Sequence, residues 1–255
     1  MARTGLIITS VMEPSDVGLT YSPTRTTYTP RERFAHTIFT LVNASHVVKP
    51  HNGDIILADA SRTGKYIEDI KKLNIAPNIH YMYMSELSNI VPYHPHKSVG
   101  EALILKMLYR YNKRFLEQYD FIIKLSGRYQ IGNQLNLDTF IPERDKLYFK
   151  DAFYFEGKWG TKLPKFCIIK INDKEIVPMY GSVIYGFHSS RLNWMTDTMG
   201  KVIEYLSKPE NIGGDMETML YFLTRPIKND ILSVDWKIWG LAGVKDSYKS
   251  GLVGY

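Results

Sequence analysis

Short apolar runs alternate with helix signals along the first half of the chain, and this alternation restricts the fold more than any other feature. The runs at residues 5–12 (GLIITSVM), 54–60 (DIILADA) and 120–125 (DFIIKL) are rich in Ile, Leu and Val, and residues 79–84 are a further candidate. Runs of this length and composition are typical of buried strands. Strands that alternate with helices form a mostly parallel sheet covered by helices on its faces, so we predict an α/β fold.

Two sequence motifs predict where helices begin. Thr29-Pro30-Arg31-Glu32 and Ser98-Val99-Gly100-Glu101 each place a hydroxyl residue three positions before a glutamate, which is the pattern of a capping box. The first also has proline at the first helical position. We expect the second helix to continue to about Gln118, a helix from Ser61 onward, and a last helix after Asp215.

The second half of the chain has a different residue pattern. Aromatic, alternating runs at residues 146–155, 166–172 and 180–187 are separated by Gly, Pro and Asn-Asp turns, which is the pattern of antiparallel strands. No repeat or linker interrupts the chain. We therefore predict a single domain over residues 1–255.

Composition excludes several classes of protein. The 32 basic and 26 acidic residues give a net charge of +6, but the basic residues are spread along the chain without a nucleic-acid-binding motif, so we expect no nucleic-acid partner. No run of about 18 apolar residues predicts a transmembrane segment, which leaves peripheral membrane contact as an option. The single cysteine, Cys167, excludes an intrachain disulfide framework and favours a reducing compartment, and we predict a cytoplasmic protein.

The ends of the predicted strands are the first place to look for a ligand, because an open α/β sheet binds ligands at the carboxyl ends of its strands. Neither Gly-x-Gly-x-x-Gly nor the phosphate loop Gly-x-x-x-x-Gly-Lys-Ser/Thr occurs at these ends, which argues against dinucleotide oxidoreductases and P-loop NTPases. Asp59 ends the second strand. Its carboxylate either caps the following segment or accepts hydrogen bonds from a nucleoside.

Four segments together resemble a known family. TPRERFAHTIFTLVNAS, DIILADAS, KSVGEALILKMLYRY and YDFIIKLSGRYQI, in this order within roughly residues 5–140, are similar to the nucleotide-sugar-binding half of GT-A glycosyltransferases, in particular bacterial and viral members with a Gly-Arg-Tyr signature. The resemblance implies a GT-A-like fold, with a nucleotide-sugar-binding half at 1–140 and an acceptor-binding half at 141–255. It also implies sugar transfer from a nucleotide-sugar donor to a hydroxyl of a glycan or other acceptor, with inversion.

The resemblance assigns the donor-binding residues. Thr9, Ser10 and Val11 would surround the base, and Asp59 would contact the nucleoside. Relatives usually carry Asp-x-Asp after the fourth strand, and this pair binds a divalent metal; here the strand runs into Ser126-Gly127-Arg128. We therefore predict no metal ligand, while a Mn²⁺ or Mg²⁺ requirement stays open.

Cations stand where the metal-binding acids are missing. Guanidinium and ammonium groups neutralise phosphate charge, so the residues predicted to face the diphosphate are Lys97, Lys124 and Arg128, with Gly127 and Tyr129 beside them. The alternative is that Arg128 and Tyr129 form a surface turn and that Lys124 extends its amine to solvent. Glu101, in the same motif as Lys97, is interpreted as part of the capping box.

Transfer with inversion needs a general base for the acceptor hydroxyl. Asp215 and Glu217 are our candidates, because their position resembles the acidic motif of inverting members. A helix N-cap and first-turn charge compensation explain the same two residues equally well. Trp159, in a glycine-rich turn, is the expected acceptor-side aromatic residue. The missing Asp-x-Asp also supports a second hypothesis, a sugar- or nucleotide-binding protein of this fold without catalysis.

Overall fold

The computed structural model describes most of the chain, namely residues 2–20, 22–132, 137, 143–156, 167–211, 213–241 and 252–254. Side chains are described at all of these positions except 241 and 252–254. No helix within these ranges is both long and apolar enough to cross a bilayer.

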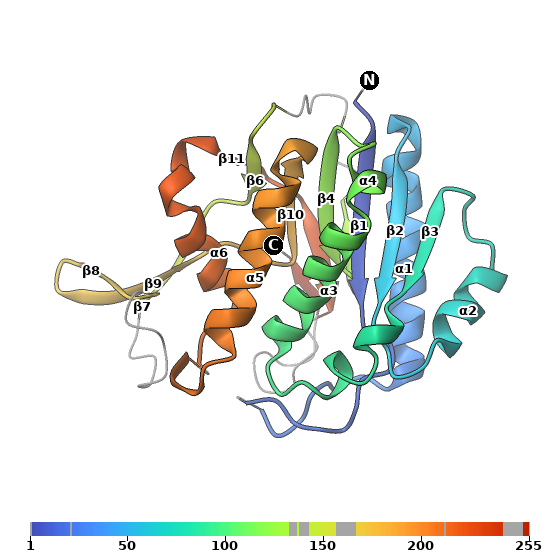
Figure 1. Cartoon of the computed structure of the whole chain (residues 1–255), viewed down its shortest axis with the longest axis horizontal. Coiled ribbons are helices and arrows are strands. Elements are labelled where there is room, and N and C mark those ends of the chain that lie inside the picture. The colour runs from blue at the N-terminus through green and yellow to red at the C-terminus, as the bar shows by residue number, and fades with distance from the viewer. Residues whose placement is uncertain are drawn as a thin grey trace.

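A seven-stranded sheet forms the centre of the molecule, in the order β11-β6-β10-β4-β1-β2-β3 (Figure 1). Its strands are β1 (Thr4–Ser10), β2 (Asp54–Asp59), β3 (Ile79–Tyr83), β4 (Phe121–Ser126), β6 (Leu147–Phe149), β10 (Ile184–His188) and β11 (Ile231–Ser233). Strand β10 runs antiparallel to both of its neighbours, and the other neighbouring pairs are parallel. The predicted α/β class is confirmed, and strands from both halves of the sequence share this sheet.

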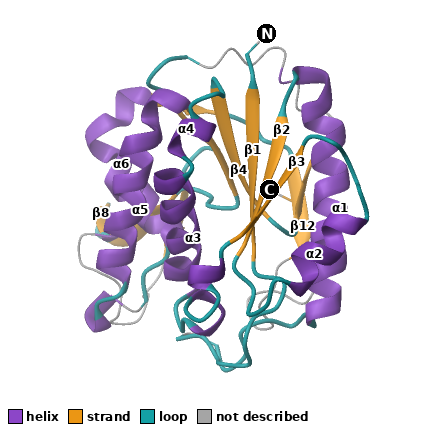
Figure 2. Ribbon diagram, turned by 45° about the vertical axis from the view of Figure 1, so that its right-hand side comes forward, coloured by secondary structure: helices purple, strands orange, loops and turns teal. Residues whose placement is uncertain are grey.

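Helices cover both faces of the sheet (Figure 2). One layer contains α1 (Pro30–Val48) and α2 (Lys65–Lys72), and the other contains α3 (Lys97–Tyr111), α4 (Lys113–Leu116), α5 (Leu192–Leu206) and α6 (Met216–Thr224). All seven residues of β1 are buried, because helices shield both of its faces. This burial explains why the strand is continuously apolar rather than alternating.

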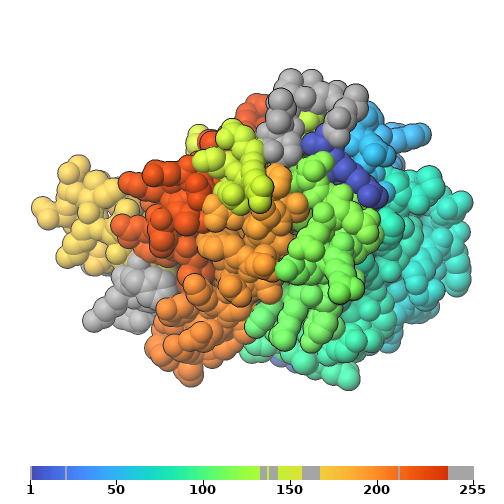
Figure 3. Space-filling model, turned by 45° about the horizontal axis from the view of Figure 1, so that its top comes forward, coloured from blue at the N-terminus to red at the C-terminus, as the bar shows by residue number. Residues whose placement is uncertain are grey.

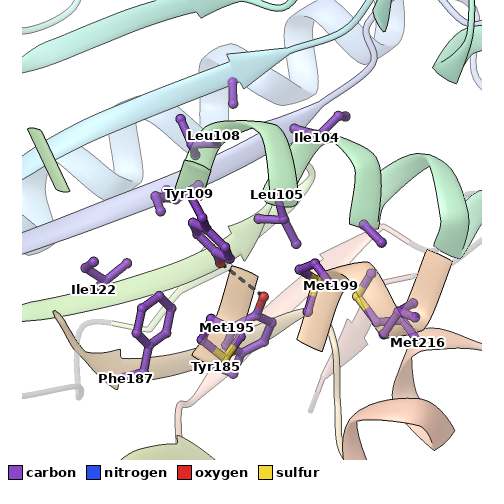
Figure 4. Packing of buried hydrophobic residues seen from close by; sticks show 14 of the residues in the cluster. Ile104, Leu105, Leu108, Tyr109, Ile122, Tyr185, Phe187, Met195, Met199 and Met216 are labelled. Atoms are coloured by element: carbon purple, nitrogen blue, oxygen red, sulfur yellow. Dashed lines mark hydrogen bonds between the residues drawn. The ribbon is translucent and has the colours of Figure 1, made fainter. Parts of the chain in front are cut away.

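The largest hydrophobic core cluster of the described residues lies between the sheet and α3, α5 and α6 (Figure 4). Tyr109 of α3 and Tyr185 of β10 are both fully buried, and their hydroxyls are hydrogen-bonded at 3.3 Å. Phe187 packs edge-on against Tyr109. The hydrogen bond reduces the cost of burying the two hydroxyls, and in this way aromatic residues from distant parts of the chain share one core.

Two small antiparallel sheets accompany the central one. One is formed by β5 (Tyr129–Ile131), β12 (Ile238–Leu241) and β13 (Leu252–Gly254), and the other by β7 (Phe153–Glu156), β8 (Ile169–Ile171) and β9 (Lys174–Met179). The strands β7, β8 and β9 project from one end of the molecule (Figures 1 and 3). Antiparallel pairing in the aromatic second half was predicted and is confirmed.

The two predicted capping boxes have different outcomes. At α1 the Thr29 hydroxyl accepts from the Glu32 amide and the Glu32 carboxylate accepts from the Thr29 amide, as predicted. The second box is wrong: α3 begins at Lys97 after His96, without a side-chain cap. Ser98 instead accepts a hydrogen bond from the backbone amide of Met216 at 3.1 Å.

Two helix boundaries differ from the prediction, and one helix was not predicted. The helix α3 ends at Tyr111, and the short α4 follows it, so the expected continuous helix to Gln118 is wrong. The helix α2 begins at Lys65 rather than near Ser61. The 15-residue α5 was not predicted; its buried residues pack against α3 in the core.

Candidate active site

A pocket of about 330 Å³ opens at the carboxyl ends of β1 and β4. The long loop that contains residues 11–20 and 22–29, dark blue at the lower edge of Figure 1, crosses this end of the sheet. The first turns of α1 and α3 and the residues just before β10 complete the walls. The pocket is therefore built where parallel strands and helix N-termini converge, the usual ligand position in an open α/β sheet.

A buried ion pair supports the floor of this pocket. The Lys124 ammonium lies 2.5 Å from Glu101 Oε1 and donates to Ser126 Oγ at 2.9 Å and to the Ser182 carbonyl oxygen at 2.5 Å. The Lys124 side chain is fully buried. Lys124 therefore does not extend to solvent; it ties together α3, β4 and the segment that leads into β10.

Glu101 is the central acceptor of this network. Its Oε1 also accepts hydrogen bonds from Thr9 Oγ1 at 3.1 Å and from Ser126 Oγ at 3.3 Å. Burial alone would raise the pKa of Glu101, but the charges of Lys124 and Lys97 and the hydrogen bonds outweigh it and lower the pKa. Glu101 is thus held ionised in the floor of the pocket, and its interpretation as a cap is wrong.

Among the described residues, four basic side chains line the pocket: Arg25, Arg33, Lys97 and Arg128. The loop carbonyls orient two of them, since Arg33 Nε donates to the Val11 oxygen at 2.7 Å and Arg25 donates to the His94 oxygen at 2.7 Å. The Arg128 guanidinium lies 5.8 Å from the centre of the Tyr28 ring. These contacts fix cations around one concave surface.

The cations disfavour one another in the absence of an anion. Loss of surrounding water is the largest influence on the pKa of Lys97, and the Arg128 charge is the second; both lower it. The pKa of Arg33 is lowered by the same two causes. Lys97 is nonetheless open to solvent at the pocket wall. A pocket that gathers several basic side chains favours a multiply charged anion.

Glu217 is the second carboxylate in the pocket. It lies in the first turn of α6 and accepts a hydrogen bond from the Ser182 hydroxyl. Burial, followed by the charge of Asp215, raises the pKa of Glu217 to about 7. A carboxylate with a pKa near neutrality is suited to general base catalysis.

The structure places eight of the twelve predicted site residues in the pocket lining: Thr9, Ser10, Val11, Lys97, Gly127, Arg128, Tyr129 and Glu217. Gly127 is needed there because a Cβ atom would lie 2.8 Å from the Thr9 carbonyl oxygen. Glycine thus allows β1 and β4 to approach each other at the pocket floor.

Three predicted residues lie outside the lining. Asp59 is fully buried and accepts from the backbone amides of Met12 and Ser61, so its carboxylate fixes the loops after β1 and β2. Lys124 lies beneath the floor, as described above. Asp215 is the N-cap of α6 and accepts from the Thr218 amide at 2.7 Å. Trp159 lies outside the described residues.

Sequence reasoning missed Arg25, Arg33 and Ser182 and gave Glu101 a different role. The available signal was the long loop after the first strand, because an ordered loop between a strand end and a helix frequently carries binding residues. Arg25 belongs to that loop and Arg33 to the first turn of the helix that follows it. Ser182 carried no local signal, since only the sheet pairing of β10 with β4 brings it to the pocket.

The donor set of the pocket does not fit a divalent metal. Mn²⁺ and Mg²⁺ prefer several oxygen ligands that carry negative charge. The end of β4 offers the Ser126 hydroxyl, the turn after it offers the Arg128 guanidinium, and Oε1 of Glu101 is paired with Lys124. Over the part of the chain that the structure describes, no three His, Cys, Asp or Glu side chains are grouped as a metal site would require.

Comparisons with known proteins give structural similarity without sequence matches. No protein-family model matches the chain, and a search of curated proteins gives no match. Among solved structures, the apo bifunctional glycosyltransferase WbbM has a TM-score of 0.49 at 10% identity. The matched region covers 91% of this chain and 39% of the WbbM chain. The galactosyltransferase LgtC, solved with donor and acceptor sugar analogues, has a TM-score of 0.48 at 10% identity, over 90% of this chain and 73% of its own.

A third similar structure is the glycosyltransferase GlyE of Streptococcus pneumoniae, with a TM-score of 0.48 at 10% identity, over 92% of this chain and 46% of its own. The chain thus spans less than half the length of WbbM and GlyE. Because each TM-score lies below 0.5, we base the function on the residues of the pocket.

Proposed function

We propose that this chain is a GT-A-like glycosyltransferase that transfers a sugar, with inversion, from a nucleotide-sugar donor to a hydroxyl group of a glycan or other acceptor. One observation carries the proposal: a single pocket at the carboxyl ends of β1 and β4 combines four cations with a carboxylate whose pKa is about 7. Cations suit the leaving diphosphate, and such a carboxylate suits the base that activates a hydroxyl.

The diphosphate would occupy the space between Arg128, Arg33 and Lys97. Each charge-assisted hydrogen bond to a phosphate oxygen contributes about 1.5–3 kcal/mol. These bonds strengthen as the bond between sugar and diphosphate breaks and negative charge gathers on the leaving group. In this proposal the cations provide the charge neutralisation that a divalent metal supplies in enzymes with Asp-x-Asp.

Glu217 would act as the general base. Its carboxylate takes the proton of the acceptor hydroxyl while the hydroxyl oxygen attacks the anomeric carbon. The bond from that carbon to the diphosphate oxygen breaks, and the electron pair leaves with the diphosphate. The hydrogen bond from Ser182 orients Glu217 for this step. Asp215, occupied as the N-cap of α6, has no direct role in this scheme.

The second candidate function is a nucleotide- or sugar-binding protein without catalysis. The absence of Asp-x-Asp from the sequence favours it. The two candidates differ in turnover, because both bind a nucleoside diphosphate in the same pocket and only the enzyme consumes a donor.

A turnover assay tests the proposal. The protein is incubated with UDP-, GDP-, dTDP- and CMP-linked sugars and a panel of glycan acceptors, in the presence of EDTA or of Mn²⁺, and release of free nucleotide is measured. We expect release with at least one donor. Glu217→Gln should lower its rate about 10²- to 10⁴-fold, whereas Asp215→Asn, which preserves a good N-cap, should retain activity. Full activity in Glu217→Gln would place the base elsewhere, and nucleotide binding without release on any donor would favour the second candidate.

We further propose that the protein is cytoplasmic, because nucleotide sugars are available there, and that any contact with a membrane is peripheral.

A further inference from the structure

Glu101 is unusual among the pocket side chains, because the protein saturates one of its oxygens and leaves the other to the pocket. Thr9, Ser126 and Lys124 all direct their donors to Oε1. No described residue donates a hydrogen bond to Oε2, and Glu101 lines the pocket with 15% of its side chain exposed. An ionised carboxylate oxygen is only an acceptor. Oε2 is therefore suited to a ligand that presents hydroxyl or amine hydrogens.

The charged side chains of the pocket form a cationic and an anionic group, and Lys97 interacts with both. The Lys97 ammonium interacts electrostatically with Arg128 and Arg33 and also with Glu101 and Glu217. Arg33 in turn interacts with Arg128 and Arg25, so the arginines form one cationic group. The two carboxylates form the anionic group, and a ligand that fits both must be negative at one end and rich in hydrogen-bond donors at the other.

A nucleotide sugar has this polarity, because its anomeric carbon is bonded directly to the diphosphate. A diphosphate bound by the cationic group leaves the sugar ring beside the carboxylates. A sugar hydroxyl then donates to Glu101, whereas a carboxylate on the sugar would face two like charges. Binding sites built around a buried polar group reject ligands that leave it unpaired or oppose its charge.

We propose that Glu101 forms the subsite for the transferred sugar, and that the donor carries a neutral, hydroxyl-rich sugar rather than a sugar acid. The inference rests on the proposed nucleotide-sugar function and adds the class of donor. Lys124, Thr9 and Ser126 act as positioning residues, since together they hold Oε1 and so fix the direction of Oε2.

Calorimetric titration of the wild-type chain provides the first part of the test. Titration with UDP, GDP, dTDP and CDP identifies the nucleotide. Two donors with that nucleotide are then compared. One carries a neutral hexose, and the other carries the hexuronate that differs only by oxidation of the C6 hydroxymethyl group. We expect the neutral donor to bind at least tenfold more tightly. Equal affinity for the two donors would overturn the sugar subsite, and a folded wild-type chain that binds none of the diphosphates would refute the proposed function itself.

Variants provide the second part. Glu101→Gln leaves Lys124 buried without its anion, so the double variant Glu101→Gln/Lys124→Met is measured beside it because it removes both charges together. The control is Glu117→Gln, an exposed glutamate that pairs with Lys113. We expect the double variant to bind the neutral donor less than threefold more tightly than the acidic donor. Its affinity for the bare diphosphate should stay within threefold of the wild-type value, and the control should behave as wild type. A double variant that folds and still prefers the neutral donor tenfold would overturn the role of Glu101.

Discussion

Replacing Lys124 with methionine tests the buried network beneath the pocket. The substitution keeps most of the apolar stem of the side chain but removes the ammonium and its contacts with Glu101, Ser126 and Ser182. Because Lys124 is fully buried and the Glu101 side chain is only 15% exposed, solvent cannot compensate the remaining negative charge. The variant therefore measures the cost of an unpaired buried carboxylate.

The size of the effect follows from this burial. Removing one partner of a buried ion pair lowers the free energy of unfolding by about 3–5 kcal/mol. For a chain of this length each kcal/mol changes the melting temperature by about 2–4 °C, which gives a decrease of roughly 6–20 °C. The double variant Lys124→Met/Glu101→Gln should recover most of the loss, since no unpaired charge remains.

The loss in Lys124→Met should also depend on pH. In the wild type the pKa of Glu101 is lowered in the folded state, so its contribution to stability is present above the unfolded pKa of about 4.3 and disappears as the pH falls through the folded value. Without Lys124 the effect of burial dominates and raises the folded pKa. The loss of stability in Lys124→Met is therefore largest at high pH, where Glu101 is ionised. It becomes smaller as the pH falls toward the raised pKa of Glu101 in the folded variant.

Thermal unfolding at pH 7.5 and at pH 5, followed by circular dichroism, measures both effects. We expect a larger difference from wild type at pH 7.5 than at pH 5. A melting temperature within 2 °C of wild type at pH 7.5, or a double variant no more stable than the single one, would refute the role assigned to the Lys124–Glu101 pair.

Three further predictions concern the pocket. Arg128→Ala should weaken nucleoside diphosphate binding about 10- to 100-fold through the loss of charge-assisted hydrogen bonds, and titration calorimetry showing a change below threefold would contradict this. The rate of transfer should rise with pH through about 7 as Glu217 loses its proton, and Asp215→Asn should move this rise to lower pH because the Asp215 charge raises the pKa of Glu217; an unmoved profile would contradict the coupling. Gly127→Ala should lower stability by about 1–3 kcal/mol in thermal unfolding, since its Cβ would lie 2.8 Å from the Thr9 oxygen, and an unchanged melting temperature would show that the strands separate freely.

The sequence predicted those parts of the fold that depend on local patterns. The first, second and fourth strands are mostly apolar runs that can be recognised without knowledge of their partners, and the Thr29 capping box is satisfied entirely by neighbouring residues. The same pattern at Ser98 failed because tertiary partners compete for both side chains. Met216 donates to Ser98, and Lys124 binds Glu101.

Site residues at the end of a predicted strand could be predicted from the sequence. Site residues that tertiary structure brings in from distant parts of the chain were missed. Arg128 and Thr9 belong to the first kind. Glu217 was found as a candidate, but only the structure separates it from Asp215, whose carboxylate caps α6 while that of Glu217 faces the pocket. Ser182 reaches the site through the antiparallel pairing of β10 with β4, which no local spacing reveals.

A crystal structure of the chain with its nucleoside diphosphate, grown without divalent metal, tests the central claim most directly. We predict phosphate oxygens at about 2.7–3.0 Å from the Arg128 guanidinium and the Lys97 ammonium, within the pocket at the ends of β1 and β4. A diphosphate bound outside this pocket, or one that requires a metal ion coordinated by carboxylates, would contradict it.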